Sequence, residues 1–522
     1  MSEYTFLQNG DGTYVRKCYG FETSMATMSD LHDGTSHMIY SVHIDTVKPV
    51  WQDEVVSTAR SAWTRLRHQV PLIGATTKGS ATPGGAFIFE YTTPQNAEAA
   101  AVWAQRTVVV AETAAPSLFV RHRDLARNRS WTPSTPHDNA ELHVCAIEAG
   151  GWVLSITAGH HVIDGRISLA LLDELLMHFD AVFRGAEIPL EEIAWGEEVT
   201  RLPKAAAIIF AEGKVSPPPP PPTGPMPGLG QLMPFLTPRI TKGEAAYSVK
   251  LTIAATAAFH AATKHVEGTV THAITALCML AFTETELHMA ARAGPAQFAT
   301  AAGAYRTMQS FLLPSCPIDQ RQKLPNEHRD LRAAYSTPLM VLDESPVFVP
   351  MASLKQLVAV DPAMGTVTTE WHSEVFDQLV RDVGTALRSI DDSPTAFIAR
   401  EAARQKADNI AAFDAAVHVP LLATVSSLGD TTRLGRFQRF VPGNSGDAAL
   451  VLVDFLGGAR SSSAFTVVGA YQHAGELRVH LCSGGGPTGS RALCDLVRAL
   501  KSAIAKFVKL PESNVLDIGI DV

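Results

Sequence analysis

A short segment in the first half of the chain constrains the fold more than any other part of the sequence. Residues 142–148 and 152–158 are apolar runs rich in β-branched residues, with Ala-Gly-Gly between them, and this pattern predicts a β-hairpin. Between residues 167 and 183, apolar residues recur at the period of an amphipathic helix. The sequence therefore predicts a strand that leads into a helix, with two adjacent histidines, His160 and His161, on the turn between them.

This turn carries residue types that suit general base catalysis. Imidazole exchanges protons near neutral pH, and a turn held between a buried strand and a packed helix presents a ring nitrogen rigidly to a substrate hydroxyl. Asp164 can face back into the protein, pair with a basic residue and fix the turn, which leaves His160 to point outward. The alternative is that the histidine packs in the core beside a turn-forming Asp-Gly and has no catalytic role.

The sequence His160-x-x-x-Asp164-Gly165, placed after a strand and before a helix, resembles the signature of the HxxxD acyltransferase superfamily. This superfamily includes chloramphenicol acetyltransferase, the plant BAHD enzymes, peptide-synthetase condensation domains and the fungal trichothecene O-acetyltransferases. In overall style and length, the chain is similar to the fungal enzymes. The resemblance implies an α/β chloramphenicol-acetyltransferase-like fold, with two lobes of mixed sheets flanked by helices and a channel between the lobes.

The resemblance also implies a reaction. His160 would remove the proton from an alcohol acceptor, and the alkoxide would attack the thioester of an acyl-CoA such as acetyl-CoA. Asp164 would support the turn, and Gly165 is a candidate for the oxyanion site or the substrate channel. Acyl-CoA is then a co-substrate, and neither a metal nor a permanently bound cofactor is needed. The acceptor expected from this resemblance is a small-molecule secondary metabolite.

Two stretches in the second half extend the resemblance. The segment 425–429, which contains Ser426 and Ser427, resembles the strand end that faces the histidine in several members, where hydroxyls can stabilise an oxyanion. Ordinary strand-end serines are the alternative. The segment from Asp454 to Gly457 and Gly458 resembles the DFGWG loop of the BAHD enzymes, but it lacks the tryptophan. We expect a structural loop there, outside the plant-type branch.

Composition limits the class of protein. The 522 residues carry a net charge of -9, which argues against nucleic-acid binding, because phosphate contacts need a clustered positive surface. The N-terminal residues lack the pattern of a secretory signal, and no apolar run approaches 18 residues. The six cysteines are scattered without metal-type spacing. These observations predict a cytoplasmic protein with reduced thiols and no membrane span, and we expect a monomer.

The chain is long enough for two or three domains. Residues 1–200 are expected to form an N-terminal lobe with the histidine motif, and residues 247–522 a C-terminal lobe. Between them, residues 201–246 are expected to form a crossover, because the Pro-rich segment 217–227 cannot continue a helix or a central strand. A proline-directed docking site is the functional alternative for that segment.

The remaining segments follow simple periodicity rules. Further strands and helices are predicted in both halves. The predicted strands are 13–24, 36–47, 86–92, 247–253, 418–430, 450–458, 464–471 and 477–482, and the predicted helices are 50–68, 269–282 and 489–508. Because the late strands follow one another closely, we expect them to form successive hairpins.

Three other functions compete with an acyl-CoA-dependent O-acyltransferase. A condensation-type enzyme would use carrier-bound acyl groups, and a binding protein would keep the fold without turnover. Intact His160 and Asp164 argue against the latter. The segment 484–489 satisfies the glycine pattern of a dinucleotide-binding loop, but only 33 residues follow it, too few to complete a nucleotide-binding unit.

Overall fold

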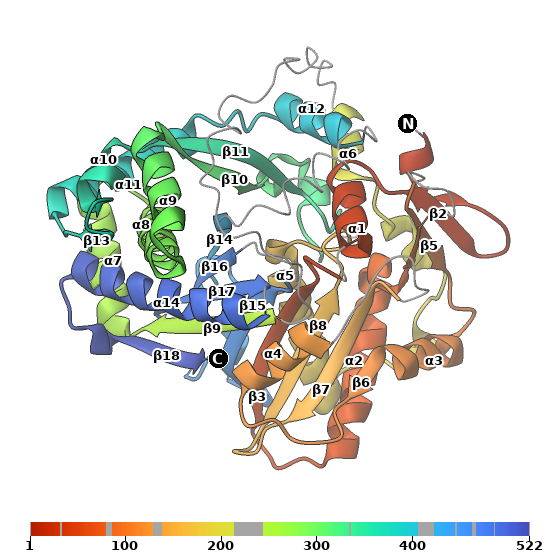
Figure 1. Ribbon diagram of the computed structural model, residues 1–522. Helices are drawn as coiled ribbons and strands as arrows, with labels where there is room; N and C mark the ends of the chain where they lie inside the picture. The colour runs from red at the N-terminus through yellow and green to blue at the C-terminus, as the bar shows by residue number, and fades with distance from the viewer. Residues whose placement is uncertain are drawn as a thin grey trace.

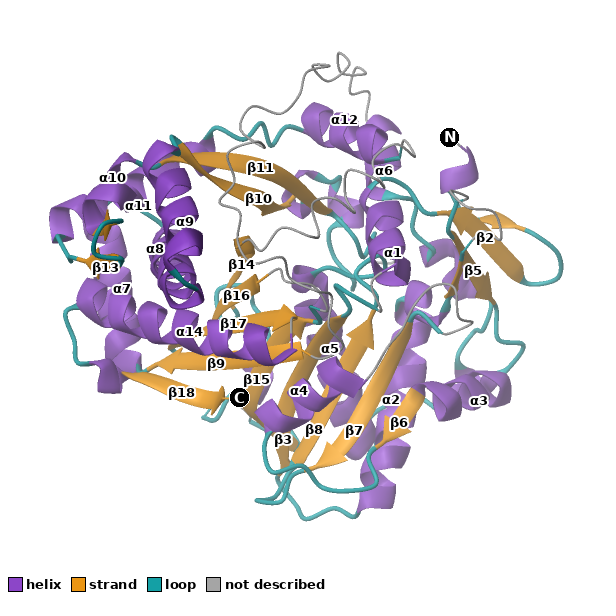
Figure 2. Cartoon of the chain, viewed as in Figure 1, coloured by secondary structure: helices purple, strands orange, loops and turns teal. Residues whose placement is uncertain are grey.

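Two mixed β-sheets, each with helices packed on it, form two lobes that lie side by side (Figures 1 and 2). The structure is a computed structural model, and it describes residues 2–520 except 32–33, 80–85, 129–137, 213–243, 333–335, 406–421, 444–445, 462–465 and 485. The Pro-rich segment 217–227 lies outside the described residues. The expected two-lobed α/β architecture is confirmed.

The first lobe is built on a five-stranded sheet in which β6 and β7 are parallel and the other neighbours are antiparallel. In spatial order, its strands are β15 (Leu450–Ala459), β3 (Met38–Thr46), β8 (Trp152–Ala158), β7 (Ala140–Ala146) and β6 (Val108–Val110). The helices packed on it are α2 (Gln52–Gln69), α4 (Leu118–Asn128) and α5 (Gly165–Phe183). The predicted hairpin and the predicted helix after it are thus β7, β8 and α5.

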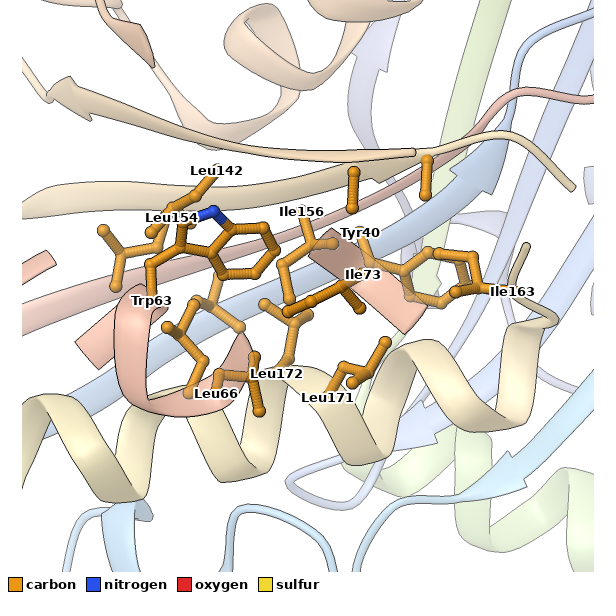
Figure 3. Close-up of a cluster of buried hydrophobic side chains, with 14 of the residues drawn as sticks. Tyr40, Trp63, Leu66, Ile73, Leu142, Leu154, Ile156, Ile163, Leu171 and Leu172 are labelled. Carbon is orange, nitrogen blue, oxygen red and sulfur yellow. The ribbon is translucent and has the colours of Figure 1, made fainter. Parts of the chain in front are cut away.

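The core of this lobe lies between the sheet and helices α2 and α5. Side chains alternate across a strand, so every second residue of the central strands faces these helices, and those residues are apolar. Tyr40, Leu142 and Ile156 from the strands pack with Trp63 of α2 and Leu172 of α5 (Figure 3). All five are buried. Helix α5 is therefore fixed to the sheet along its length, which anchors the turn that precedes it.

The second lobe is built on a seven-stranded sheet in which β14 runs parallel to both neighbours. In spatial order, its strands are β11 (Leu342–Pro350), β10 (Ser310–Asp319), β14 (Leu422–Asp430), β16 (Thr466–His473), β17 (Glu476–Gly484), β9 (Glu244–Leu251) and β18 (Val515–Ile520). The helices of this lobe are α7 (Ile253–His265), α8 (Val270–Ala293), α9 (Pro295–Thr307), α11 (Ser373–Arg388) and α14 (Gly486–Val508). The side chain of Thr269 caps α8.

Smaller elements complete the two lobes. Four short strands form a separate sheet beside the first lobe, and two form a hairpin in the second. These strands are β1 (Leu7–Gln8), β2 (Thr13–Lys17), β4 (Thr76–Lys78), β5 (Ile88–Thr92), β12 (Val358–Asp361) and β13 (Thr366–Thr369). The other described helices are α1 (Phe21–Leu31), α3 (Ala97–Thr107), α6 (Ala206–Glu212), α10 (Ala352–Leu357) and α12 (Pro394–Arg404).

Among the described helices, none alone is long and apolar enough to cross a membrane, and only α7 and α8 taken together, with a bend of 96°, would be. All six cysteines are free thiols, and five of them are buried.

Two sequence-based expectations differ from the structure. Residues 13–24 were expected to be extended, but β2 ends at Lys17 and helix α1 begins at Phe21. The late strands were expected to form successive hairpins, but the chain leaves the second sheet after β14, supplies β15 to the first sheet, and returns as β16. The first sheet therefore takes one strand from residues 450–459. The boundaries of the three expected segments stay a prediction.

Candidate functional site

The turn between β8 and α5 is fixed by its own hydrogen bonds. The backbone N–H of Val162 donates to the carbonyl of Gly159 over 2.9 Å. At the other end, the Asp164 carboxylate caps α5 by accepting from the N–H of Ile167 over 2.9 Å, and the Ser168 hydroxyl donates to the Asp164 carbonyl over 2.7 Å. An N-cap of this kind satisfies a helix donor that otherwise has no partner. The motif residues thus lie in one defined conformation.

His160 is held with one ring nitrogen bound and the other unengaged. Its Nδ1 lies 3.0 Å from the carbonyl oxygen of Ile163. Because a carbonyl only accepts hydrogen bonds, Nδ1 carries the proton and Nε2 carries the lone pair. The ring is half-buried and meets the edge of Phe21 at 5.7 Å between centroids. Among the described residues, none hydrogen-bonds Nε2, so this nitrogen can accept a proton from a ligand.

His161 has a different environment from its neighbour. Its ring is buried, stacks on Phe89 at 6.0 Å, and places Nε2 3.1 Å from the Thr77 hydroxyl. A Cβ atom at Gly159 would lie 2.3 Å from this ring, so the glycine gives it room to fold back. Burial, with the charge of His160, lowers the pKa of His161 to about 3. This histidine is therefore neutral and structural.

Acid is expected to destabilise the protein through His161. The pKa of this ring is lowered from 6.5 to about 3 in the folded chain, so its contribution to stability is complete above pH 6.5 and is lost as the pH falls toward 3. The loss by pH 5 is on the order of 1–2 kcal/mol. Urea unfolding at pH 7.5 and 5.0 should show a larger loss for the wild type than for His161→Gln. Equal losses in the two proteins would contradict this.

Asp164 pairs with a buried arginine of the second lobe. Arg321, just after β10, donates from Nη2 to Oδ2 of Asp164 over 2.9 Å, and the Val341 N–H donates to the same oxygen over 3.1 Å. Burial alone would raise the pKa of Asp164, but the Arg321 charge and the hydrogen bonds hold it below its usual value. The expected pairing of Asp164 with an arginine is confirmed, and the pair joins the histidine turn to the second lobe.

Strand β14 of the second lobe approaches the same turn. A Cβ atom at Gly165 would lie 2.6 Å from the Leu428 side chain and 2.8 Å from the Tyr40 hydroxyl, so this close contact requires glycine. Val425 belongs to the core of the second lobe, and side chains alternate along a strand. Alternation therefore predicts that Ser426 points to the first-lobe side of β14 and Ser427 to the side of Val425, and both serines are half-buried. Among described groups, no hydrogen-bond partner engages either hydroxyl.

Asp454 and Gly457 were expected to lie in a loop, but both lie inside strand β15. Arg478 pairs with Asp454 at 2.5 Å across the two sheets. A Cβ atom at Gly457 would lie 2.6 Å from the Tyr40 ring, and one at Gly458 would lie 2.8 Å from the His480 ring. The loop prediction, which came from the resemblance to the DFGWG segment, was wrong, whereas the strand predicted over 450–458 is confirmed; the two glycines allow the sheets to approach closely.

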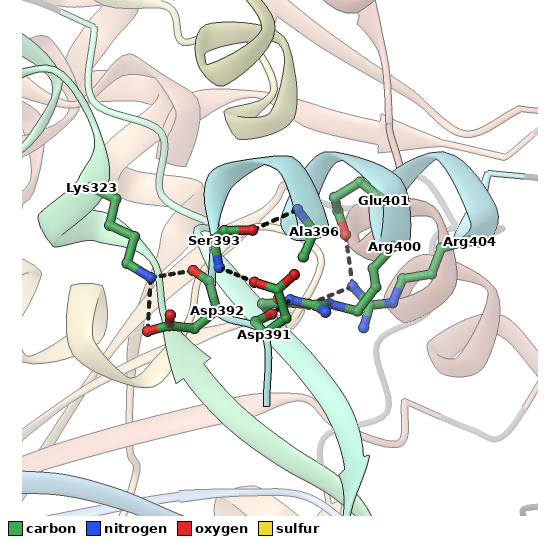
Figure 4. A network of polar contacts seen from close by, with 9 residues as sticks. Lys323, Asp391, Asp392, Ser393, Ala396, Arg400, Glu401 and Arg404 are labelled. Atoms are coloured by element: carbon green, nitrogen blue, oxygen red, sulfur yellow. Dashed lines mark hydrogen bonds and ion pairs between the residues drawn. The ribbon is translucent and has the colours of Figure 1, made fainter. Parts of the chain in front are cut away.

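Phe21, which touches His160, is held by helix α12 from the second lobe. Its N–H donates to both Glu401 oxygens over 3.1 Å, and the Arg404 guanidinium lies 5.2 Å over its ring. Figure 4 shows the polar network of α12 in which Arg404 also donates to Glu401. Gly20 precedes Phe21 with a φ of +57°, and a Cβ atom there would clash with Glu401.

Sequence reasoning missed Phe21 and Arg321 as neighbours of the motif. Neither residue lies in a pattern that marks it, and each reaches the turn only through the tertiary fold. In the described part of the chain, no group of three or more histidine, cysteine or acidic side chains is placed to hold a metal ion.

No protein-family model matches the chain, and no curated protein sequence does. Similar solved structures do exist, and they define a class of fold. They include acetyltransferases, and together with the two-lobed arrangement of sheets in this chain they confirm the expected chloramphenicol-acetyltransferase-like fold.

Three solved structures illustrate the similarity. TRI3 trichothecene 15-O-acetyltransferase from Fusarium sporotrichioides has a TM-score of 0.67 and 13% identity, over 97% of this chain and 98% of that chain. Polyketide synthase associated protein 5 from Mycobacterium tuberculosis has a TM-score of 0.55 and 13% identity, over 95% and 99%. F. sporotrichioides TRI101, complexed with coenzyme A and T-2, has a TM-score of 0.52 and 12% identity, over 95% and 98%.

Proposed function

We propose that the protein is an O-acyltransferase that moves an acyl group, such as the acetyl group of acetyl-CoA, from CoA to a hydroxyl of a small-molecule secondary metabolite. The observation that carries this proposal is the state of His160. Its Nδ1 is tied to the Ile163 carbonyl, and its Nε2 is unengaged in the described structure. The solved relatives in fold include acetyltransferases, one of them with coenzyme A bound.

In the proposed reaction, Nε2 of His160 takes the proton of the acceptor hydroxyl as the oxygen attacks the thioester carbonyl. The carbonyl oxygen becomes an oxyanion, and the Ser426 hydroxyl is our candidate donor to it, because Ser426 is predicted to point to the first-lobe side of β14. A donor of this kind is worth about 3 kcal/mol in studied enzymes. When the C–S bond breaks, the His160 imidazolium returns its proton to the CoA thiolate, and an ester is released.

Asp164 takes no proton in this scheme. Its carboxylate is engaged by Arg321 and by two backbone N–H groups, so it acts as a positioning residue for the turn. The substrates would reach His160 through a channel between the lobes, which is part of the proposal.

The test is release of the CoA thiol. Acetyl-CoA and longer acyl-CoAs are offered with panels of hydroxylated small molecules, thiol release is followed, and the ester is identified by mass spectrometry. We expect release by the wild type that exceeds release by His160→Ala. The proposal fails if no acyl-CoA and acceptor give release above that of the variant.

A condensation-type enzyme is the second candidate, because the fold is also similar to the first condensation domain of the calcium-dependent antibiotic synthetase, with a TM-score of 0.51 and 13% identity over 95% of this chain and 97% of that chain. Such an enzyme would take its acyl group from a carrier protein. Offering the same acyl group on CoA and on a phosphopantetheinylated carrier separates the two candidates, since only one donor should be consumed.

A further inference from the structure

Arg166 is a half-buried cation that directly follows the histidine motif. It is the second residue of α5, next to Gly165. The opposite lobe leaves room for it at Gly429 of β14, where a Cβ atom would lie 3.4 Å from its Nη2. Gly429 has a φ of +88°, a conformation that favours glycine. The guanidinium thus lies against bare backbone at the boundary between the lobes, three residues beyond Ser426 along the strand.

The acids near Arg166 are engaged elsewhere. Asp164 pairs with Arg321, and Arg321 also pairs with Asp319 at 3.2 Å. Both carboxylates attract Arg166 at longer range, but burial dominates and lowers its pKa. Within the described chain, Arg166 makes no hydrogen bond and no ion pair. Leaving a half-buried guanidinium without a partner costs free energy, which a bound anion would offset.

We propose that Arg166 binds an anionic group of a substrate, a carboxylate or a phosphate, at the boundary between the lobes. The planar guanidinium matches both groups because it can donate two parallel hydrogen bonds to them. One of two groups would supply this anion: a carboxylate on the acceptor, or a phosphate of the acyl-CoA. This inference rests on the proposed function, and it narrows the substrates that the site accepts.

The experiment compares Arg166→Gln, which removes the charge, with Arg166→Lys, which keeps the charge but cannot form the bidentate hydrogen bond. Arg433→Gln is the matched control, because Arg433 follows the same strand but its side chain is 84% exposed. Thermal shift measurements use malonate and inorganic pyrophosphate as probes. Calorimetry compares the binding of CoA with that of pantetheine, which lacks the phosphates of CoA. If Arg166→Gln does not fold, Arg166→Lys carries the same measurements.

We expect an anion to stabilise the wild type and the control, and Arg166→Gln to lose that stabilisation. A phosphate source predicts that Arg166→Gln binds CoA about 10- to 100-fold more weakly, with pantetheine binding unchanged. If the anion is a carboxylate of the acceptor, Arg166→Gln should bind CoA as the wild type does, but malonate should no longer stabilise it. Affinities and thermal shifts of Arg166→Gln within twofold of the wild type for every probe would overturn the proposal.

These measurements do not depend on turnover. A wild type that binds an anion through Arg166 but releases no CoA thiol with any acceptor would refute the acyltransferase function and keep the anion site. If the wild type transfers acyl groups but no probe binds differently when Arg166 is replaced, the acyltransferase function is kept and the anion site is refuted.

Discussion

Replacing His160 with alanine is expected to lower acyl-transfer turnover by roughly 10²- to 10⁴-fold, the range typical of a lost general base. The acceptor proton then has no group to receive it, because Nε2 of His160 is the nitrogen left unengaged by the turn. CoA binding should remain close to that of the wild type, since the substitution removes only the ring of one half-buried residue. Thiol release measures the first quantity, and calorimetry with CoA measures the second.

His161→Ala is the matched control on the neighbouring residue. Its ring packs on Phe89 and contacts the Thr77 hydroxyl, so its removal should lower thermal stability and reduce turnover less than His160→Ala does. An inactive His161→Ala beside a His160→Ala of near-normal turnover would mean that the wrong histidine has been assigned as the base.

Asp164→Ala is expected to lower the free energy of unfolding by about 3–5 kcal/mol. The substitution leaves the Arg321 guanidinium buried without its partner, and it also removes the N-cap of α5. Urea unfolding at pH 7.5 measures the loss. Arg321→Met alone and the double variant complete a double-mutant cycle, and the double variant should lose less than the sum of the two single variants.

Asp447→Ala is the control for this cycle. Asp447 also pairs with arginines, but its side chain is 74% exposed, and exposed pairs contribute about 0–1 kcal/mol. An Asp164→Ala protein with the unfolding midpoint and turnover of the wild type would show that the inter-lobe pair supports neither the fold nor the histidine turn.

Local patterns predicted the elements that present the motif. The hairpin and the helix after it follow from residues close together in sequence, because periodicity is a short-range effect. The arginine partner of Asp164 was expected, but Arg321 could not be named, because the fold brings it from 157 residues further along.

Long-range contacts explain the failures. Residues 13–24 resemble a strand locally, but Glu401, 380 residues away, accepts the first N–H of helix α1. The choice between Ser426 and Ser427 likewise depends on which sheet face meets which lobe. Local sequence contains no signal for either, since both are decided by packing between segments far apart in the chain.

Strand β15 has a consequence for how the chain comes to be folded during its synthesis. It supplies the edge partner of β3, and their pairing joins residues 38–46 to 450–459. A nascent chain therefore carries β3 with one unpaired edge until residues 450–459 have been translated. Unpaired strand edges are sites of aggregation, and pairings between distant residues form slowly. The first lobe is thus completed by a strand that leaves the ribosome about 400 residues after β3, and a fragment ending before residue 450 lacks the strand that covers β3.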